Sequence, residues 1–297
     1  MMEDYSRSDL ACESSGIQDG DALPSDVYRE EKSGGFDISR LCIRDDFYED
    51  MLGKPKGTYV TVTCGKIWLM DAEPWETLVS LLARELRDMC AKVSGRRVDR
   101  GFGVLVAGLG NSEITPDAIG PDSVRKLNVT RHLRAIDEKL YDTVGRCEIS
   151  AVFPGVLGQT GIETVELIRG AAENAGPDVV LAIDALAARS CERLAATVQL
   201  SDCGIRPGSG IGNNRKAICQ DTVGVPVIAL GVPTVVNSST LVYDALRQAG
   251  IEEIRPALRR VLENGRSFFV SPKESDVITD RVSSLIADAV DRAFTLE

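Results

Sequence analysis

The sequence contains one histidine among 297 residues, which narrows the chemistry that it can perform. A Ser-His-Asp triad or a Cys-His pair would have to use His132, which lies in the polar segment 130–134 (TRHLR), away from any predicted strand end. The eight cysteines form no C-x-x-C pair and have no histidine beside them. We therefore expect a surface histidine, no zinc site, no disulfide framework and no cofactor.

Positive charge and long apolar runs are also scarce. The sequence has 34 basic and 45 acidic residues, and the resulting net charge of −11 would repel a nucleic-acid backbone or an anionic membrane. No run approaches the roughly 18 apolar residues of a membrane span, and the first 16 residues lack the basic and apolar regions of a signal peptide. The sequence predicts a cytoplasmic protein without a nucleic-acid or membrane partner.

The chain is long enough, with 43% apolar residues, to bury one substantial α/β core. Residues 147–153 read as a strand, 155–161 as a glycine-rich loop, 160–176 as a helix and 179–183 as another strand. Strand, loop, helix, strand is the order that builds a parallel sheet. We therefore predict a single α/β domain around a largely parallel sheet.

The periodicity of apolar residues and the positions of turn residues predict further strands and helices. We expect strands at 58–64 and 67–70, joined at 65–66, and a helix over 75–92 with Pro74 in its first turn. We also expect a helical pattern at 129–140, strands at 102–109, 195–200 and 225–231, and a C-terminal helix that begins with a capping box at 271–274.

Two aspartates follow buried strands. Asp117 lies in the loop after the apolar run 102–109, and Asp184 directly ends the run 179–183. Ligands in open α/β sheets bind outside the carboxyl ends of the strands, so both acids stand where chemistry is expected. Structural roles are also open: Asp184 could cap a helix at 185–194, and Asp117 could close an Asx turn behind Pro116.

Two carboxylates that share one pocket cannot both ionise comfortably, so one proton is shared and the pair divides into a base and an acid. Such a dyad can activate water against an amide and protonate the leaving amine. A metal held by carboxylate oxygens and Asn111 is the alternative. Spacing alone leaves both open.

The glycine-rich segment 204–216 fits neither phosphate-binding signature, because its glycines do not follow G-x-G-x-x-G and no G-K-[ST] is present. It predicts a flexible loop or a binding loop. A further alternative for the chemistry uses Ser209 of this loop as nucleophile and Lys216 as base.

Residues 1–35 hold nine acids and three bases with few large apolar residues, so we expect them to lie outside the core. Within them, Ser8–Glu13 places an acid, an apolar residue and alanine in a segment expected to be exposed, where proteolysis concentrates.

Five segments together resemble the germination protease of spore-forming bacteria: 108–121, 154–164, 182–190, 207–216 and 231–236. They occur in the family's order and span most of residues 102–236, whereas 45–98 offers no matching motif. The resemblance implies an α/β/α sandwich of three layers, related to hydrogenase maturation proteases. It implies a homotetrameric endopeptidase that degrades small acid-soluble spore proteins at germination, in the forespore or spore core.

The resemblance also implies site residues. The family's catalytic aspartates match Asp117 and Asp184, and within the matching segments Asn111, Thr115 and Ser209 are candidate substrate-binding residues. Members are made as zymogens whose cleavage sites have an acid, a large apolar residue and alanine, with a glutamate shortly after. Residues 9–13 (DLACE) are similar, which predicts a cut between Asp9 and Leu10.

The predicted organisation is therefore a propeptide at 1–9, an acidic flexible extension at 10–35 and a catalytic domain at 36–297. The function predicted is a self-processing aspartic endopeptidase. The alternatives are a metal-dependent hydrolase, a maturation protease whose aspartates hold a partner's metal, and a spore-protein binder without catalysis.

Overall fold

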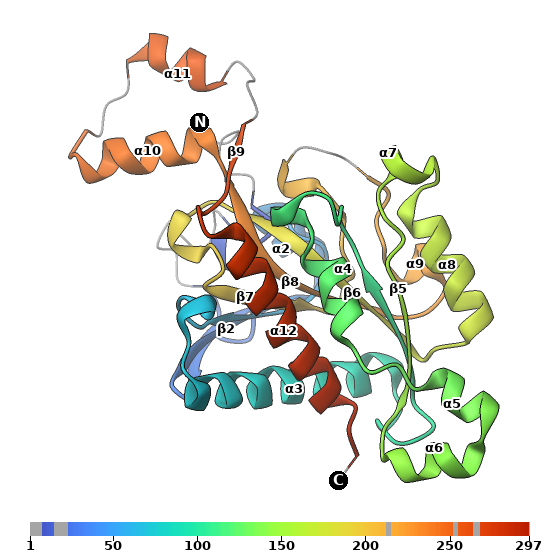
Figure 1. The fold of residues 1–297 in the computed structure, drawn as a ribbon. Coiled ribbons are helices and arrows are strands. Elements are labelled where there is room, and N and C mark those ends of the chain that lie inside the picture. Colours follow the sequence, from blue (N-terminus) through green and yellow to red (C-terminus); the bar gives the residue numbers. More distant parts are fainter. Residues whose placement is uncertain (1–7, 15–22, 212–214, 252–254, 264–267, 297) are drawn as a thin grey trace.

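A single mixed sheet organises the described part of the chain, which in this computed structural model comprises residues 8–14, 23–211, 215–251, 255–263 and 268–296 (Figure 1). The strand order is β1-β2-β3-β7-β8-β6-β4-β5, with β9 paired to β8. The strands are β1 (Tyr28–Ser33), β2 (Phe36–Ile43), β3 (Gly57–Thr63), β4 (Gly103–Gly108), β5 (Glu148–Val152), β6 (Val179–Ala188), β7 (Thr197–Ser201), β8 (Val227–Asn237) and β9 (Phe269–Val270).

Four adjacent strands, β8, β6, β4 and β5, pair in parallel, and β1, β2, β3 and β7 add an antiparallel half. The parallel strands are apolar along almost their whole length, because helices cover both of their faces. The hairpin β1–β2 turns at Gly34 and Gly35, both with positive φ, as a two-residue turn of this kind requires. The predicted α/β fold is confirmed, with parallel pairing confined to these four strands.

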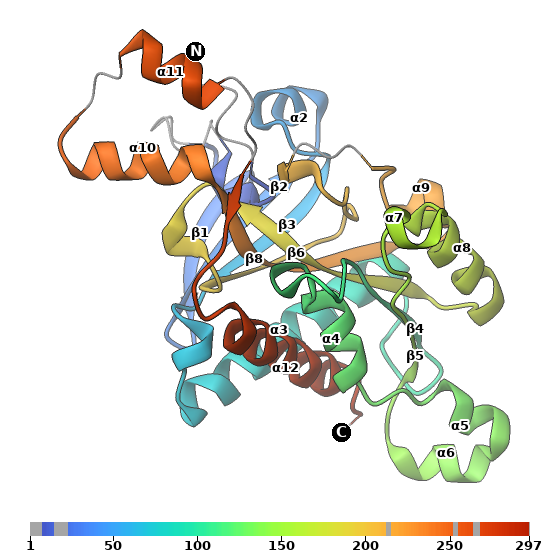
Figure 2. The ribbon, with the colours of Figure 1, turned by 45° about the horizontal axis from the view of Figure 1, so that its top comes forward.

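Helices form a layer on each face of the sheet (Figures 1 and 2). On one face α3 (Ala72–Ser94), α4 (Ile119–Lys126) and α12 (Ser275–Ala293) share one apolar core with inward residues of the central strands. On the other face α8 (Thr164–Ala175) and α9 (Gln220–Val223) pack over a second cluster. The remaining helices are α2 (Asp46–Leu52), α5 (Arg131–Ile136), α6 (Glu138–Val144), α7 (Leu157–Thr160), α10 (Ser238–Gln248) and α11 (Pro256–Glu263).

Several predicted elements differ from the structure. The predicted strand at 67–70 is a 3-10 turn, η2 (Ile67–Leu69), and the helical pattern at 129–140 divides into α5 and α6 at Asp137, whose side chain caps α6. The capping box predicted at 271–274 is wrong, since α12 begins at Ser275. The helix predicted at 185–194 is also wrong, because β6 continues to Ala188, where it still pairs with β8. Strand pairing overrides the helix propensity of this alanine-rich run.

The N-terminal segment packs more closely than its composition predicts. Leu10 and Ala11 are fully buried, so the expectation that residues 1–35 lie outside the core is wrong for this part, whereas residues 28–33 form the largely exposed edge strand β1. Residues 1–7 and 15–22, which hold the rest of the predicted extension, lie outside the described residues. Among the residues described, none of the helices is long and apolar enough to cross a membrane.

Candidate active site

The loop after β4 is folded tightly by glycines. Gly110 has a φ of +109°, and a Cβ there would lie 2.0 Å from the carbonyl oxygen of Asp117. A Cβ on Gly120 would lie 2.2 Å from the carbonyl oxygen of Leu109. Side chains at either position would push this loop open, so glycine is needed to bring Asp117 back over the end of β4.

Asp117 ends the short 3-10 turn η3 (Thr115–Asp117). Its Oδ2 accepts a hydrogen bond of 2.7 Å from the backbone N–H of Asn111, six residues earlier, so the carboxylate spans the loop and does not form the Asx turn considered above. Burial raises the pKa of Asp117, and the Asn111 hydrogen bond opposes that rise because it favours the charged form.

Asp184 lies inside β6, in register with Gly231 of β8, and only 6% of it is exposed. Its Oδ1 accepts a hydrogen bond of 2.9 Å from the N–H of Ala185. Burial raises its pKa well above the usual range of aspartate, and the nearby carboxylates of Asp117 and Asp9 raise it further. Because the residue is in a strand, the helix-capping role considered from sequence is excluded.

The two predicted catalytic aspartates therefore lie near each other beyond the carboxyl end of β4, close enough for the charge of Asp117 to act on Asp184. The N–H of Leu109, at the start of the Asp117 loop, donates to the carbonyl of Ile183 at 2.8 Å, immediately before Asp184. The charge of Asp117 raises the pKa of Asp184, as a like charge in the same site does, whereas the pKa of Asp117 itself is raised by burial.

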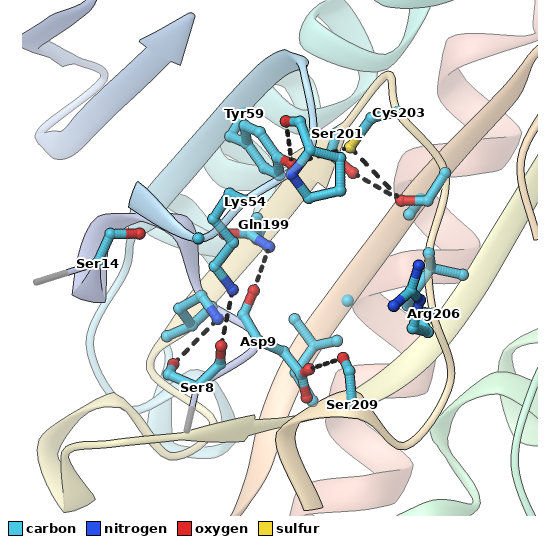
Figure 3. A pocket seen from close by; sticks show the side chains of 18 of the residues that line it. Ser8, Asp9, Ser14, Lys54, Tyr59, Gln199, Ser201, Cys203, Arg206 and Ser209 are labelled. Carbon is cyan, nitrogen blue, oxygen red and sulfur yellow. Dashed lines mark hydrogen bonds between the residues drawn. The ribbon is translucent and has the colours of Figure 1, made fainter. Parts of the chain in front are cut away.

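A third acid, Asp9, is held beside them. Strand β4 ends opposite Ile183, which leaves the later residues of β6 with an open edge on that side. Asp9 uses this edge: its N–H donates to the carbonyl of Ala187, and its Oδ2 accepts from the N–H of Ala187, each at 2.9 Å. Ser209 Oγ donates to the other carboxylate oxygen at 2.6 Å (Figure 3). The residue before the predicted cut thus lies close to Asp184.

Gln199 on β7 holds the peptide backbone around the predicted cut. Its Nε2 donates to the carbonyl of Asp9 at 3.1 Å, and its Oε1 accepts from the N–H of Ala11 at 2.6 Å. Gln199, Gly231 and Asp184 are in register across β7, β8 and β6, so their side-chain positions share one face of the sheet. The sequence offered a signal for Gln199 that was missed, a polar residue inside an apolar strand.

A cavity of about 710 Å³ adjoins this segment (Figure 3). Lys54 lines it and donates from Nζ to the carbonyl of Ser8 at 2.7 Å. Burial lowers the pKa of Lys54, against the opposing effects of Asp9 and Glu13. Because residues 45–98 offered no motif, Lys54 was not predicted. Further residues of β7, of the loop after β7 and of β8 line the cavity: Gln199, Ser201, Cys203, Gly204, Ala229 and Gly231.

The candidate substrate-binding residues occupy different places. Ser209 contacts Asp9, as described above. The side-chain oxygen of Asn111 accepts from Gln159 Nε2 at 2.9 Å, and the exposed Thr115 accepts at its carbonyl from Thr279 Oγ1 at 2.9 Å. Lys216 Nζ lies 3.3 Å from Glu166 Oε1 on α8, whereas Ser209 Oγ donates to Asp9. The two residues therefore have different partners and do not form the nucleophile–base pair considered above.

His132 is exposed on α5, and the eight cysteines, all of them within the described residues, form no disulfide. No group of three or more His, Cys, Asp or Glu residues in the described ranges is arranged to hold a metal ion.

The site thus combines an α/β domain with two neighbouring carboxyls of raised pKa, Asp117 and Asp184, which lie near the chain's own segment around Asp9. The model of one family, germination protease, matches residues 9–249. The chain is 36% identical to the germination protease of Caldanaerobacter subterraneus subsp. tengcongensis, over 97% of this chain and 93% of the relative. It is 39% identical to that of Clostridium acetobutylicum, over 86% and 84% of the two chains.

A third relative, the germination protease of Bacillus subtilis, is 41% identical over 81% of this chain and 66% of its own length. The chain therefore belongs to the germination protease family, and it is a protease of the spore germination class. The family resemblance read from five sequence segments is confirmed.

Proposed function

We propose that this protein is a self-processing endopeptidase that degrades small acid-soluble spore proteins at the start of germination, with Asp117 and Asp184 as an aspartic dyad. The observation that carries the proposal is the convergence of three acids: Asp9, at the predicted cleavage site, and Asp117 both raise the pKa of the buried Asp184. Family membership supports the protease class, and this arrangement supports the mechanism.

The environments of the two aspartates suggest their roles. Asp184 is the more deeply buried and has two acids nearby, so it holds the shared proton. Asp117, whose carboxylate accepts the Asn111 N–H, is the ionised base. A water molecule gives a proton to Asp117 as its oxygen attacks the carbonyl carbon of the residue before the cut. The C–N bond breaks, the proton of Asp184 passes to the leaving amine, and a new carboxylic acid remains, which gives its proton to the solvent and becomes a carboxylate.

Self-processing would remove residues 1–9 by cutting between Asp9 and Leu10. Asp9 is fixed by Ala187 and Ser209, and Leu10 is fully buried among Leu186, Ala188 and Val236. Asp9 joins the open edge of β6 through a backbone hydrogen bond, a common way in which proteins bind peptides, and the residues after Leu10 form a short 3-10 helix, Ala11–Glu13. The family resemblance further suggests a homotetramer acting in the forespore or spore core, without a direct nucleic-acid partner and without a cofactor.

The test is intact-mass spectrometry of the full-length protein and its Asp117→Asn and Asp184→Asn variants, during incubation at mildly acidic pH. Asp37→Asn is the matched control, because its side chain is 64% exposed and pairs only with Lys32 in the contacts shown. We expect the wild type and the control to lose residues 1–9, and both dyad variants to slow by at least about 10³-fold.

Loss of the same residues in all variants would contradict the proposal. A parallel incubation with EDTA distinguishes the dyad from a metal-dependent hydrolase: the dyad continues to cut, whereas a metal enzyme stops and recovers when divalent ions are returned.

A further inference from the structure

The oxygen of the cleaved carbonyl gains negative charge during the proposed reaction. When water attacks the carbonyl carbon, two electrons of the C=O double bond move to the carbonyl oxygen, which becomes an oxyanion. Asp117 takes the proton of the water and Asp184 protonates the leaving amine, so neither aspartate is assigned to that oxygen. Enzymes that cleave amides place N–H donors there, and removal of one such donor slows catalysis by about 10²–10³-fold.

The side chain of Gln199 donates to this oxygen. Its Nε2 lies 3.1 Å from the carbonyl oxygen of Asp9, which belongs to the Asp9–Leu10 peptide bond that we expect to be cut (Figure 3). Its Oε1 accepts from the N–H of Ala11 at 2.6 Å. Because a carbonyl oxygen only accepts and an N–H only donates, the two contacts together fix which end of the amide faces Asp9. Gln199 is buried, so little water competes for its NH₂ group.

The sheet places Gln199 and Asp184 on either side of the Asp9–Leu10 bond. Gly231 of β8 is in register with Gln199 of β7 on one side and with Asp184 of β6 on the other. Two strand spacings separate the Cα atoms of Gln199 and Asp184 by roughly 10 Å, and both side chains point to the same face. Leu186 leans over Gly231, since a Cβ there would lie 2.6 Å from Leu186 Cγ, and Leu186 packs in one cluster with Leu10. The donor and the acid thus approach the peptide bond from different strands.

We propose that Gln199 is a catalytic residue whose side-chain N–H stabilises the oxyanion formed at the Asp9 carbonyl. This inference rests on the proposed endopeptidase function. The water oxygen forms a bond to the carbonyl carbon, and the oxyanion accepts a stronger hydrogen bond from Gln199 than the neutral carbonyl does. When the C–N bond breaks, the C=O double bond forms again. Gln199 contacts only backbone groups of the segment, so it acts on the chemical step and selects no side chain.

The experiment measures the first-order rate of self-cleavage by intact mass in three full-length variants. Gln199→Met keeps the length of the side chain and removes the N–H donor. Gln199→Glu keeps an oxygen for the Ala11 N–H, and it can donate to Asp9 only while the introduced carboxyl is protonated. Gln220→Met is the control, because Gln220 is exposed at the start of α9 and its side chain has no hydrogen bond within the ranges that the structure describes.

We expect Gln199→Met to slow self-cleavage by at least about 10²-fold at every pH, and the control to match the wild type. Gln199→Glu should be similarly slow at neutral pH and should recover as the pH falls, because the protonated carboxyl supplies the donor again. Asp9, Asp117 and Asp184 titrate in all of these proteins, so each rate is divided by the wild-type rate at the same pH. A ratio for Gln199→Glu that does not rise toward low pH would contradict the donor role.

A second measurement separates catalysis from mere holding of the segment. The Asp9 N–H donates to the Ala187 carbonyl, a contact in which Gln199 takes no part, so its hydrogen exchange reports whether the segment stays in place. Exchange is followed by NMR in Asp184→Asn with and without Gln199→Met. We expect the exchange rate to change by no more than about 10-fold, the range for a neutral hydrogen bond. Loss of Asp9 protection in the Gln199→Met variant would overturn the proposal, because displacement of the segment would then explain slow cleavage.

The outcomes distinguish this inference from the proposed function. If the wild type is cut and Gln199→Met is cut within about 10-fold of the same rate, only the role of Gln199 is overturned. If Gln199→Met is slow while Asp117→Asn and Asp184→Asn are cut normally, the dyad is wrong and the oxyanion donor is supported. If neither the wild type nor the control is cut, both proposals fail.

Discussion

Asp9 and Ala187 exchange two hydrogen bonds, one from the Asp9 N–H to the Ala187 carbonyl and one from the Ala187 N–H to the Asp9 carboxylate, each at 2.9 Å. The pairing is available because β6 extends past the end of β4, so the edge beyond Ile183 is open. One backbone position therefore fixes both the path of the segment and the carboxylate of the residue before the predicted cut. Four predictions follow from the surroundings of this contact.

Gly210→Ala should impair self-cleavage through a steric effect alone. A Cβ at Gly210 would lie 2.4 Å from Asp9 Oδ2 and 2.8 Å from the Ala187 Cβ, so the Asp9 carboxylate must leave its place. We expect removal of residues 1–9 to slow by about 10-fold or more, since a displacement of about 1 Å from a reactive geometry can cost 10²-fold. Gly170→Ala on α8 is the control, because its Cβ would meet nothing within 4 Å. Equal cleavage rates in the two variants would show that self-cleavage does not require the position of the Asp9 carboxylate beside Gly210.

Asp9→Asn should lower the pKa of Asp184. The Asp9 carboxylate is one of the causes that raise this pKa, after burial and Asp117, and the substitution removes that charge while keeping the side-chain shape. The measurement is the titration of the Asp184 carboxyl carbon by ¹³C NMR in the wild type and in Asp9→Asn. The exposed substitution Asp37→Asn serves as the control. An unchanged or higher pKa would show that Asp9 does not act on Asp184 electrostatically.

Asp184→Asn should stabilise the folded protein, and the gain should grow as the pH rises. The folded-state pKa of Asp184 is raised above its unfolded value of about 3.9, so its favourable contribution is present below that value and is lost as pH rises through the folded pKa. Asparagine has no proton to lose. We expect a gain of about 0.5–2 kcal/mol in the free energy of unfolding at neutral pH, as is common when a destabilising functional group is replaced.

Urea unfolding from pH 4 to 8 measures this difference between the variant and the wild type. Asp37→Asn, an exposed site, should stay within about 0.5 kcal/mol of the wild type at every pH. A difference for Asp184→Asn that shrinks with rising pH would show that the pKa of Asp184 is lowered in the folded state.

Ser209→Ala should weaken self-cleavage without abolishing it. Ser209 Oγ donates to the Asp9 carboxylate at 2.6 Å, and loss of one hydrogen bond to a charged group lowers the rate by about 10–100-fold. Lys216→Ala should have no effect, because Lys216 pairs with Glu166 on the surface of α8. Time courses by intact mass measure both. A complete loss with Ser209→Ala, together with a strong loss with Lys216→Ala, would instead indicate a serine nucleophile with a lysine base.

Much of the fold could be predicted from local pattern. The apolar runs at 102–109 and 179–183 lie in strands, because a strand that is buried on both faces is apolar without interruption. The apolar stripe at 75–92 lies in helix α3, because a helix that is buried on one face repeats apolar residues at the helical period. The helix predicted after Asp184 was wrong for a physical reason. Its alanines favour a helix locally, but pairing with β8 continues through Ala188, and the sequence does not reveal how far a neighbouring strand extends.

The candidate site, like the fold, could be predicted only in part from the sequence. The sequence by itself determined that Asp117 and Asp184 come after apolar runs and that residues 9–13 carry an acid, an apolar residue, alanine and a glutamate. Only the tertiary structure decided that Asp9 and Asp117 lie near Asp184, and that Gln199 and Lys54 hold the backbone around Asp9. Those contacts join positions more than 40 residues apart, so they depend on strand order and on the open edge of β6, which no local period encodes.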